Sequence, residues 1–329
     1  MDERNNIVMV TGCAGFIGYH VAKRLLTEGY RVLGIDQIND YYDPILKRAR
    51  LRMLKESANF SFIEDALESR EVLDNLSTQE SITMVLHFAA QAGVRYSLTN
   101  PYVYGKSNLE AFIHILEYCK VRQIPLLYAS SSSVYGGNQK QPFSEQDRVE
   151  TPISLYAATK RANELMAYTY SHLYQLPTIG LRFFTVYGPW GRPDMAIYKF
   201  TDAIMKQQPI EIYNHGKMKR DFTYIDDIVE AISRLMNKIP SSQGSHPPYK
   251  LYNIGSHKPV ELLYLIELLE NELNQKAVKT FLPIQSGDVP ETFADITELE
   301  NDINYKPQVS IEEGIKRFVA WYKDYYKIT

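Results

Sequence analysis

Tyr156 and Lys160 are the two residues whose types and spacing point most directly to chemistry. Side chains four positions apart lie on one face of an α-helix, so both can reach a single ligand. A phenol is a weak base with an ordinary pKa of about 10. A neighbouring ammonium group favours the phenolate and lowers that pKa toward neutrality, where a general base works best. The pair therefore predicts a tyrosine base supported by a lysine.

A strand, a turn and a helix near the N-terminus supply a second signal. Residues 7–10 predict a short buried strand, residues 20–28 predict a helix, and residues 30–35 predict a strand that ends before Asp36. This frame suits a dinucleotide, whose pyrophosphate meets the free N–H groups of the helix N-terminus. Asp36 would bind the ribose hydroxyls and repel a 2′-phosphate, which favours NAD over NADP. The alternative is a glycine-rich connection in another kind of α/β protein.

The turn itself contains three glycines with the spacing Gly-x-x-Gly-x-x-Gly. Gly12 allows the tight turn, Gly15 lets the backbone approach a pyrophosphate, and Gly18 lets the helix pack closely on the strand. Together with Tyr156 and Lys160, this spacing resembles the short-chain dehydrogenase/reductase superfamily. The length of 329 residues points to the extended branch of that superfamily.

Further stretches along almost the whole chain resemble the nucleotide-sugar epimerases and dehydratases of this superfamily. They are residues 87–91, 130–136, 182–189 and 220–227. The resemblance implies an α/β fold with a Rossmann-like doubly wound parallel sheet and a smaller C-terminal substrate-binding lobe. We expect an NAD-binding domain over residues 1–180 and a nucleotide-sugar-binding lobe over residues 181–329. Part of residues 222–256 is expected to return to the first domain.

Alternating elements support this sheet up to about residue 180, because a doubly wound fold requires strands and helices in alternation. The expected strands and helices after the first unit of strand, helix and strand are residues 84–88, 102–122, 126–129, 156–174 and 179–184. Residues 240–249 read as a loop rich in Pro, Ser and Gly. The aromatic C-terminus predicts an amphipathic helix packed on the substrate lobe.

Ser131 completes the expected catalytic group. It lies 25 residues before Tyr156, at the end of the strand over residues 126–129, and ligands of open α/β sheets bind beyond the C-terminal ends of the strands. The resemblance places the catalytic hydroxyl four residues before the tyrosine of Val-Tyr-Gly, which is Ser131. Turn chemistry at a strand end is the alternative for this run of serines, and it is favoured for Ser130.

The resemblance implies a mechanism in which Tyr156, as phenolate, removes the proton of a sugar hydroxyl while the carbon beneath it passes hydride to NAD⁺. Lys160 would bind the nicotinamide ribose and hold the phenolate. For epimerisation the ketone turns over and bound NADH returns the hydride to its opposite face. Related 4,6-dehydratases carry Asp-Glu directly after the catalytic hydroxyl residue. This chain has Ser132 and Ser133 there, which argues against dehydration.

Other NAD contacts are implied by the resemblance alone. They are expected from Phe16, Ile17, Asp65 and Ala89, with Asp65 meeting the adenine amino group. Asn108 is expected to meet the helix that supports the active site.

The sugar is suggested by three stretches that resemble the UDP-glucuronate 4-epimerases, namely residues 39–43, 91–97 and 185–196. They imply conversion of UDP-glucuronate to UDP-galacturonate through a 4-keto intermediate. That intermediate is a β-keto acid, which loses CO₂ when its carboxylate turns perpendicular to the ketone. We expect Thr185 and Ser133 to bind the carboxylate and Arg192 to order the loop around it. The alternative for Arg192 is an ion pair with Asp194.

The nucleotide is expected to meet two more residues of the second lobe. The Arg220 guanidinium could hold a diphosphate bidentately, and the alternative is a surface salt bridge. Residues 285–295 match the nucleotide-sugar segment of the family, which implies a substrate contact from Asp288. Many relatives have a basic residue just before this match, whereas this chain has Gln285. The substrate set is thus Ser132, Ser133, Thr185, Arg192, Arg220 and Asp288.

Composition excludes several other classes of protein. The net charge is −3 and 45% of the residues are hydrophobic, with no basic stripe for nucleic acid. Apolar runs are too short to span a bilayer, and the charged N-terminus lacks a signal peptide. Of the two cysteines, Cys13 lies in the cofactor turn, so a structural disulfide is not expected. No metal-ligand spacing is present, and His87 is expected to be structural. These features fit the cytoplasm.

Three alternatives to a UDP-glucuronate 4-epimerase remain open. The first is a 4-epimerase of another UDP-hexose, UDP-glucose or UDP-N-acetylglucosamine. The others are an NAD-binding scaffold or sensor and a nucleic-acid-binding relative. As is usual in the family, the helices over residues 102–122 and 156–174 are expected to pair with their copies in a homodimer through a four-helix bundle.

Overall fold

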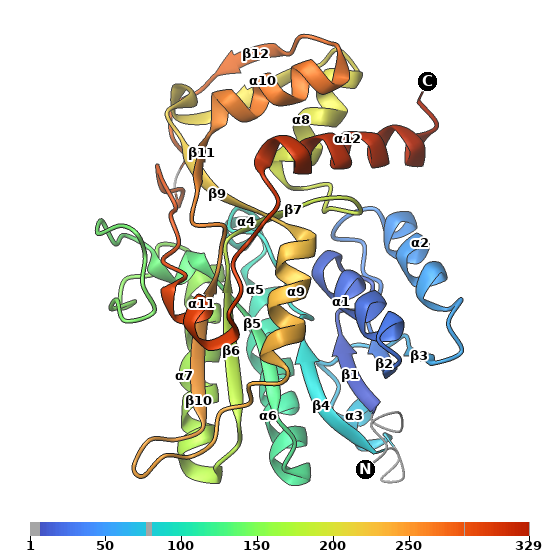
Figure 1. Ribbon diagram of the computed structural model, residues 1–329, viewed down its shortest axis with the longest axis vertical. Helices are drawn as coiled ribbons and strands as arrows, with labels where there is room; N and C mark the ends of the chain where they lie inside the picture. The colour runs from blue at the N-terminus through green and yellow to red at the C-terminus, as the bar shows by residue number, and fades with distance from the viewer. Residues whose placement is uncertain (1–6, 77–80, 286, 329) are drawn as a thin grey trace. The chain divides into compact units, whose positions relative to one another are not determined.

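The computed structural model describes residues 7–76, 81–285 and 287–328 (Figure 1). The chain divides into two compact units, each built from segments that are separate in the sequence. The first unit comprises Met1–Asn138, Glu145–Phe183 and Ile232–Tyr252. The second unit comprises Gln139–Ser144, Phe184–Ala231 and Asn253–Thr329.

A seven-stranded sheet with the strand order β10-β6-β5-β4-β1-β2-β3 forms the centre of the first unit. Its strands are β1 (Ile7–Thr11), β2 (Arg31–Ile35), β3 (Phe60–Ile63), β4 (Ile82–His87), β5 (Leu126–Ser131), β6 (Thr178–Phe183) and β10 (Tyr249–Ile254). Strands β1 to β6 pair in parallel. The order reverses between β1 and β4, which confirms the predicted Rossmann-like doubly wound sheet.

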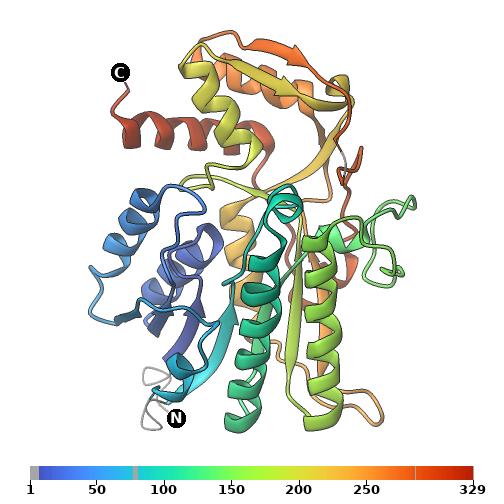
Figure 2. The ribbon, with the colours of Figure 1, turned by 180° about the vertical axis from the view of Figure 1, so that it is seen from behind.

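Helices cover both faces of this sheet. They are α1 (Phe16–Thr27), α2 (Pro44–Leu54), α3 (Glu71–Asp74), α4 (Tyr96–Thr99), α5 (Pro101–Tyr104), the π-helix η2 (Gly105–Glu110), α6 (Ala111–Arg122), the 3-10 helix η3 (Ser132–Tyr135) and α7 (Leu155–Tyr174). Helix α1 lies over one face in Figure 1, and α6 and α7 lie over the other face in Figure 2. All five residues of β1 are buried, as expected for a parallel strand covered on both faces.

The first helix begins earlier than the sequence pattern predicts. Helix α1 begins at Phe16, four residues before the expected start at His20. Its N-cap is Gly15, whose extended backbone (φ −72°, ψ 172°) leads directly into the first helical turn. The free N–H groups of the helix N-terminus therefore lie within the glycine turn itself, where an anion would meet them.

The helix predicted over residues 102–122 is confirmed, but it is not α-helical throughout. The π-helix η2 interrupts it between α5 and α6. Within η2, the backbone carbonyl of Asn108 accepts a hydrogen bond of 2.6 Å from the Asn163 side chain. A carbonyl bonded by a side chain from another helix is drawn out of the regular ladder, and such bulges are the usual site of a π turn.

The second unit carries two small sheets, with the orders β11-β9-β7 and β12-β8. Its strands are β7 (Thr185–Tyr187), β8 (Pro209–Ile212), β9 (Lys219–Tyr224), β11 (Pro259–Glu261) and β12 (Val278–Phe281). Its helices are α8 (Ala196–Met205), η4 (Tyr213–Gly216), α10 (Leu262–Leu273), α11 (Thr297–Ile303) and α12 (Ile311–Tyr326), while α9 (Ile225–Leu235) crosses the boundary between the units.

The C-terminal helix α12 packs on the second unit as predicted. It buries one apolar face formed by Ile315, Phe318, Val319 and Tyr322. Its approach to β7 is close at Gly314, where a Cβ atom would lie 2.0 Å from the Tyr187 hydroxyl oxygen. The predicted loop over residues 240–249 is also confirmed, with β10 beginning at Tyr249.

No helix among the described residues has the length and apolar character needed to cross a bilayer. Cys13 and Cys119 are both buried free thiols.

Candidate active site

The glycine turn lies at the point where the strand order of the first unit reverses. Gly12 follows β1 with a positive φ of 70°, and Ala89 follows the neighbouring strand β4. A Cβ atom at Gly12 would lie 2.7 Å from the Ala89 backbone nitrogen, and one at Gly18 would lie 2.2 Å from the Gly12 carbonyl oxygen. Both positions therefore require glycine. Without side chains there, the backbone of the turn lies close to the backbone of Phe88 and Ala89 after β4. This is the crevice in which doubly wound sheets bind nucleotides.

Asp36 closes this turn from the end of β2. Its two carboxylate oxygens accept hydrogen bonds from the backbone N–H groups of Ala14 at 3.0 Å and Ile38 at 2.9 Å. The carboxylate is thereby held beside the glycine turn, with further lone pairs available to ribose hydroxyls. A diphosphate at the N-terminus of α1 and a ribose at Asp36 fit these groups.

The other predicted cofactor residues follow the C-terminal ends of strands in the same sheet. Phe16 is buried and Ile17 is half-buried. In the first turn of α1, their backbone N–H groups are therefore the groups that could bind a cofactor. Asp65 is exposed two residues after β3, and its Oδ1 accepts a hydrogen bond of 2.7 Å from the Ala66 N–H. Its contact with adenine stays a prediction.

Helix α7 carries Tyr156 and Lys160 in its first turns. The helix begins after Ser154, whose Oγ accepts a hydrogen bond of 3.1 Å from the Ala157 N–H and so caps it. The Lys160 ammonium donates to the Ala129 carbonyl on β5 at 2.9 Å. This contact brings the lysine to within two residues of Ser131 along that strand. Burial lowers the pKa of Lys160 to about 8.

The two serines at the end of β5 have different environments. We use the term serine segment for Ser130–Ser133. The Ser131 Oγ accepts a hydrogen bond of 3.2 Å from the Ser133 N–H and donates one of 3.2 Å to the Ser133 hydroxyl. The Ser130 hydroxyl instead donates to Glu164 at 2.7 Å. Side chains alternate along a strand, so the Ser130 and Ser131 side chains leave β5 on opposite faces. Ser132 is half-buried.

His87 is buried at the end of β4. Its Nδ1 lies 2.8 Å from the Thr11 hydroxyl oxygen. Burial, with a smaller contribution from the charge of Lys160, lowers the pKa of His87 to about 3. A ring that is neutral at physiological pH and tied to β1 agrees with the structural role expected for it.

Asn108 connects the end of β4 to α7. Its side chain accepts a hydrogen bond of 2.8 Å from the Gln91 N–H and donates to the Gln91 carbonyl at 3.0 Å. It also donates to the Thr159 hydroxyl at 3.0 Å, and Thr159 in turn donates to the Tyr156 carbonyl at 2.8 Å. The prediction that Asn108 meets the active-site helix is thus supported by direct contacts.

Three further residues of this region had no role in the sequence analysis. Glu164 and Arg182 form a buried ion pair with an N···O distance of 2.8 Å. Burial disfavours the charged form of Arg182. The hydrogen bonds and the charge of Glu164 outweigh this effect and raise the pKa of Arg182 above its ordinary value. The ring of buried Tyr104 meets Tyr156 edge-on with ring centroids 6.2 Å apart. A lone arginine in an apolar strand was the one available signal, since a buried charge needs a partner.

The predicted substrate residues Thr185 and Arg192 lie in the second unit. Thr185 begins β7 and pairs with Phe222 on β9. The Arg192 Nε donates to Asp194 at 3.0 Å, with both side chains about three-quarters buried (22% and 24% exposed). The ion pair that was the alternative for Arg192 is therefore present. Both residues lie in the loop between β7 and α8.

Arg220 and Asp288 are also brought together in the second unit. Arg220 on β9 donates to the Pro290 carbonyl at 3.1 Å, and its guanidinium lies 3.7 Å from the Asp288 carboxylate. The alternative of a salt bridge is thus present here too. A pair at this distance, with side chains 18% and 28% exposed, is loose enough for a diphosphate to compete with the carboxylate.

Within the residues that the structure describes, no group of three or more His, Cys, Asp and Glu side chains could hold a metal ion.

Comparisons with known proteins show the family to which the chain belongs. A family model described as "NAD dependent epimerase/dehydratase family" matches residues 8–255. The chain is 52% identical to "Protein CapI" of Staphylococcus aureus, covering 97% of this chain and 99% of that protein. It is 48% identical to the "Probable UDP-glucuronate 4-epimerase" of Rhizobium meliloti, covering 97% of each. A crystal structure of UDP-glucuronic acid 4-epimerase from Bacillus cereus with UDP-glucuronic acid and NAD matches with a TM-score of 0.88 at 31% identity, covering 98% of this chain and 100% of that chain.

The pKa of Lys160 leads to a prediction about pH. Below about 8 the buried ammonium is charged, and above that pH it loses its proton. The sequence predicts that this ammonium supports a Tyr156 phenolate, and on that prediction kcat should fall as the pH rises through about 8. The Lys160→Arg variant keeps its charge, so its fall should move to higher pH. A pH–rate profile of both proteins tests this, and a flat alkaline limb in the unmodified protein would contradict it.

Proposed function

We propose that this chain, which belongs to the NAD dependent epimerase/dehydratase family, is an NAD-dependent UDP-sugar 4-epimerase that interconverts UDP-glucuronate and UDP-galacturonate. The observation that carries the proposal is the contact of Lys160 with the Ala129 carbonyl at 2.9 Å. This contact supports the proposal because it joins the helix that carries Tyr156 to the strand that ends at Ser131. Ser132 and Ser133 stand where the related dehydratases have an acid pair, which favours epimerisation over loss of water.

The glycine turn, the N-terminus of α1 and Asp36 would hold NAD. Bound NAD supplies a hydride acceptor, and later a hydride donor, at carbon 4 of the sugar. The residues of the chain handle the proton. Tyr156 takes it from the 4-hydroxyl, Ser131 donates a hydrogen bond to the same oxygen, and Lys160 stabilises the phenolate that begins the cycle. After the 4-keto sugar has turned over, Tyr156 returns the proton to the new hydroxyl.

The carboxylate of glucuronate makes this intermediate hazardous, because a β-keto acid loses CO₂ readily. Fixed hydrogen-bond donors that keep the carboxylate near the plane of the ketone prevent that loss. We assign this role to Thr185 and Ser133, with Arg192 ordering the loop between β7 and α8. Arg220 and Asp288 are assigned to the nucleotide end of the substrate.

Purified protein incubated with UDP-glucuronate and no added cofactor tests the proposed function. We expect proton NMR to show UDP-galacturonate forming, because a cofactor regenerated in every cycle stays bound. No CO₂ and no pentose should appear. If UDP-glucuronate is unchanged even with NAD supplied, while UDP-glucose or UDP-N-acetylglucosamine is epimerised, the assignment of the carboxylate site is wrong and the epimerase chemistry stands.

The carboxylate site is tested by Thr185→Val and Arg192→Gln. Each change removes donors to a charged group, which is worth about 1.5–3 kcal/mol, so we expect turnover to fall roughly tenfold to a hundredfold and pentose to appear as a side product. Arg317→Gln is the matched control, because Arg317 also lies in the second unit and pairs with a carboxylate, Glu313, at 2.7 Å. Unchanged rate and product purity in both test variants would remove the assignment.

We further infer a homodimer through α6 and α7. Large apolar side chains are exposed along these helices and α5, namely Tyr102, Val121, Leu165 and Leu173 at 84%, 72%, 52% and 60%. An apolar row of this kind on adjacent helices suits a four-helix bundle with a second copy. Leu165→Glu should yield monomers in sedimentation experiments, whereas Leu263→Glu on α10 should not. Unmodified protein that sediments only as a monomer would contradict the inference. A cytoplasmic location stays a prediction.

A further inference from the structure

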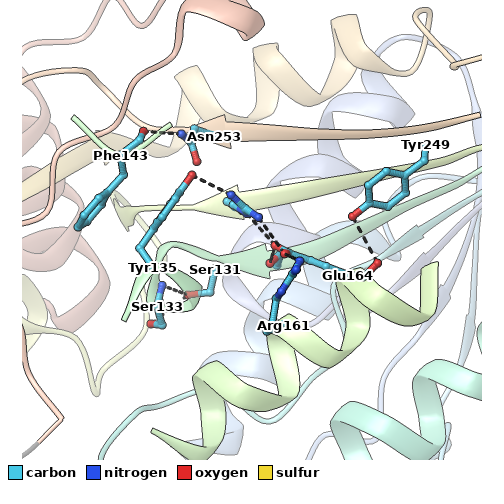
Figure 3. A network of polar contacts seen from close by, with 10 residues as sticks. Ser131, Ser133, Tyr135, Phe143, Arg161, Glu164, Tyr249 and Asn253 are labelled. Atoms are coloured by element: carbon cyan, nitrogen blue, oxygen red, sulfur yellow. Dashed lines mark hydrogen bonds and ion pairs between the residues drawn. The ribbon is translucent and has the colours of Figure 1, made fainter. Parts of the chain in front are cut away.

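A buried ion pair behind the serine segment takes no part in the chemistry proposed above. Glu164 on α7 and Arg182 on β6 have side chains that are 0% and 1% exposed. The Arg182 Nε and one terminal nitrogen donate to the two Glu164 oxygens at 2.8 and 2.9 Å. Figure 3 shows Glu164 at the centre of this network, with Arg161 donating to it at 3.0 Å.

The pair contacts residues on both sides of Ser131 in the sequence. Before Ser131, the Ser130 hydroxyl donates to Glu164 at 2.7 Å, and Ser130 is paired directly with Arg182 in the register of β5 and β6. After it, Arg182 donates to the hydroxyl of Tyr135, the last residue of η3, at 3.0 Å. Ser130 and Tyr135 are therefore bonded to one carboxylate and guanidinium pair, and Ser131 lies between them.

The same carboxylate fixes α7. Glu164 follows Lys160 by four residues, so the two side chains leave the helix on one face. They contact consecutive residues of β5, since Lys160 donates to the Ala129 carbonyl at 2.9 Å and Glu164 accepts from Ser130 at 2.7 Å. Two contacts in succession define the position of the helix along the strand. They also define how far Tyr156 stands from Ser131.

Burying two charges is a poor way to gain stability, because an apolar pair of similar volume is often as stable or more so. The hydrogen bonds of the pair do, however, restrict how its groups are oriented. A buried carboxylate with four donors has one arrangement that satisfies all of them, whereas apolar contacts allow sliding. The pair is thus suited to set geometry.

We propose that Glu164 and Arg182 are positioning residues of the reaction, which hold Ser131 and the face of α7 bearing Tyr156 and Lys160 at their working separation. The proposal rests on the catalytic roles assigned above. It predicts that loosening the network lowers kcat, while substrate and NAD affinity are unchanged, because neither residue touches either ligand in this account.

Removing the Ser130 hydroxyl tests this with little risk to folding. Ser130→Ala takes one donor from Glu164 and leaves the ion pair whole. The matched control is Ser171→Ala, since Ser171 lies on α7, is fully buried, and its hydroxyl bonds the Leu176 carbonyl and the Thr178 hydroxyl, each at 2.8 Å. Each variant loses one buried hydroxyl group, but Ser171 lies near the opposite end of α7 from Tyr156.

We expect the fall in Tm to be at least as large in Ser171→Ala as in Ser130→Ala, because the Ser171 hydroxyl has two partners. Because small misplacements of catalytic groups are costly, kcat should fall about tenfold in Ser130→Ala and less than about twofold in Ser171→Ala. KM for the UDP-sugar and Kd for NAD should stay unchanged in both. Equal kcat values in the two variants, or a rise in KM that accounts for the whole loss in Ser130→Ala, would overturn the proposal.

A second pair of variants approaches the network from its other end. Tyr135→Phe removes the acceptor of Arg182, and Tyr170→Phe is its control, since the Tyr170 hydroxyl on α7 donates to Glu117 at 2.6 Å. Only Tyr135→Phe should lower kcat. If the unmodified protein leaves UDP-glucuronate unchanged, the proposed function fails, and the same kcat ratios on whichever UDP-sugar is converted still decide the positioning role.

Discussion

Helix α7 is joined to β5 at two consecutive residues, by the Lys160 ammonium at the Ala129 carbonyl and by the Glu164 carboxylate at the Ser130 hydroxyl. Both charged groups are buried, so each needs its partner. If the helix slid by one residue, a buried charge would lose its partner, at a cost of several kcal/mol. This requirement fixes the serine at the strand end and the tyrosine on the helix relative to each other, and the proposed chemistry depends on it.

The two charges have different electrostatic surroundings. Glu164 is neutralised by Arg182 and Arg161, and Arg182 is held firmly in its charged form. Lys160 donates instead to a carbonyl, which carries only a partial charge, so burial lowers its pKa to about 8. In its charged form this lysine can donate further hydrogen bonds to the oxygen of a tyrosine base or a ribose. Arg182 therefore keeps its charge, whereas the charge of Lys160 depends on pH.

The sequence predicted the fold and the glycine turn well because both depend on local patterns. Gly12 and Gly18 have no room for a side chain, and apolar runs mark the parallel strands. The π-helix η2 could not be predicted, because it depends on the Asn163 side chain, 55 residues from Asn108. The partnership of Glu164 with Arg182 likewise requires knowledge of which strands are neighbours. Contacts within one loop were accessible, as the anticipated ion pair of Arg192 with Asp194 shows. The ligand roles of these residues stay predictions.

The central claim is that one bound complex removes hydrogen from carbon 4 and returns it to the opposite face. The most direct measurement uses UDP-glucuronate with deuterium at carbon 4, incubated with the protein in ordinary water. We expect the UDP-galacturonate formed to keep its deuterium at carbon 4, because that hydrogen never becomes a proton free to exchange with solvent. Product that has lost the deuterium to water would contradict the account.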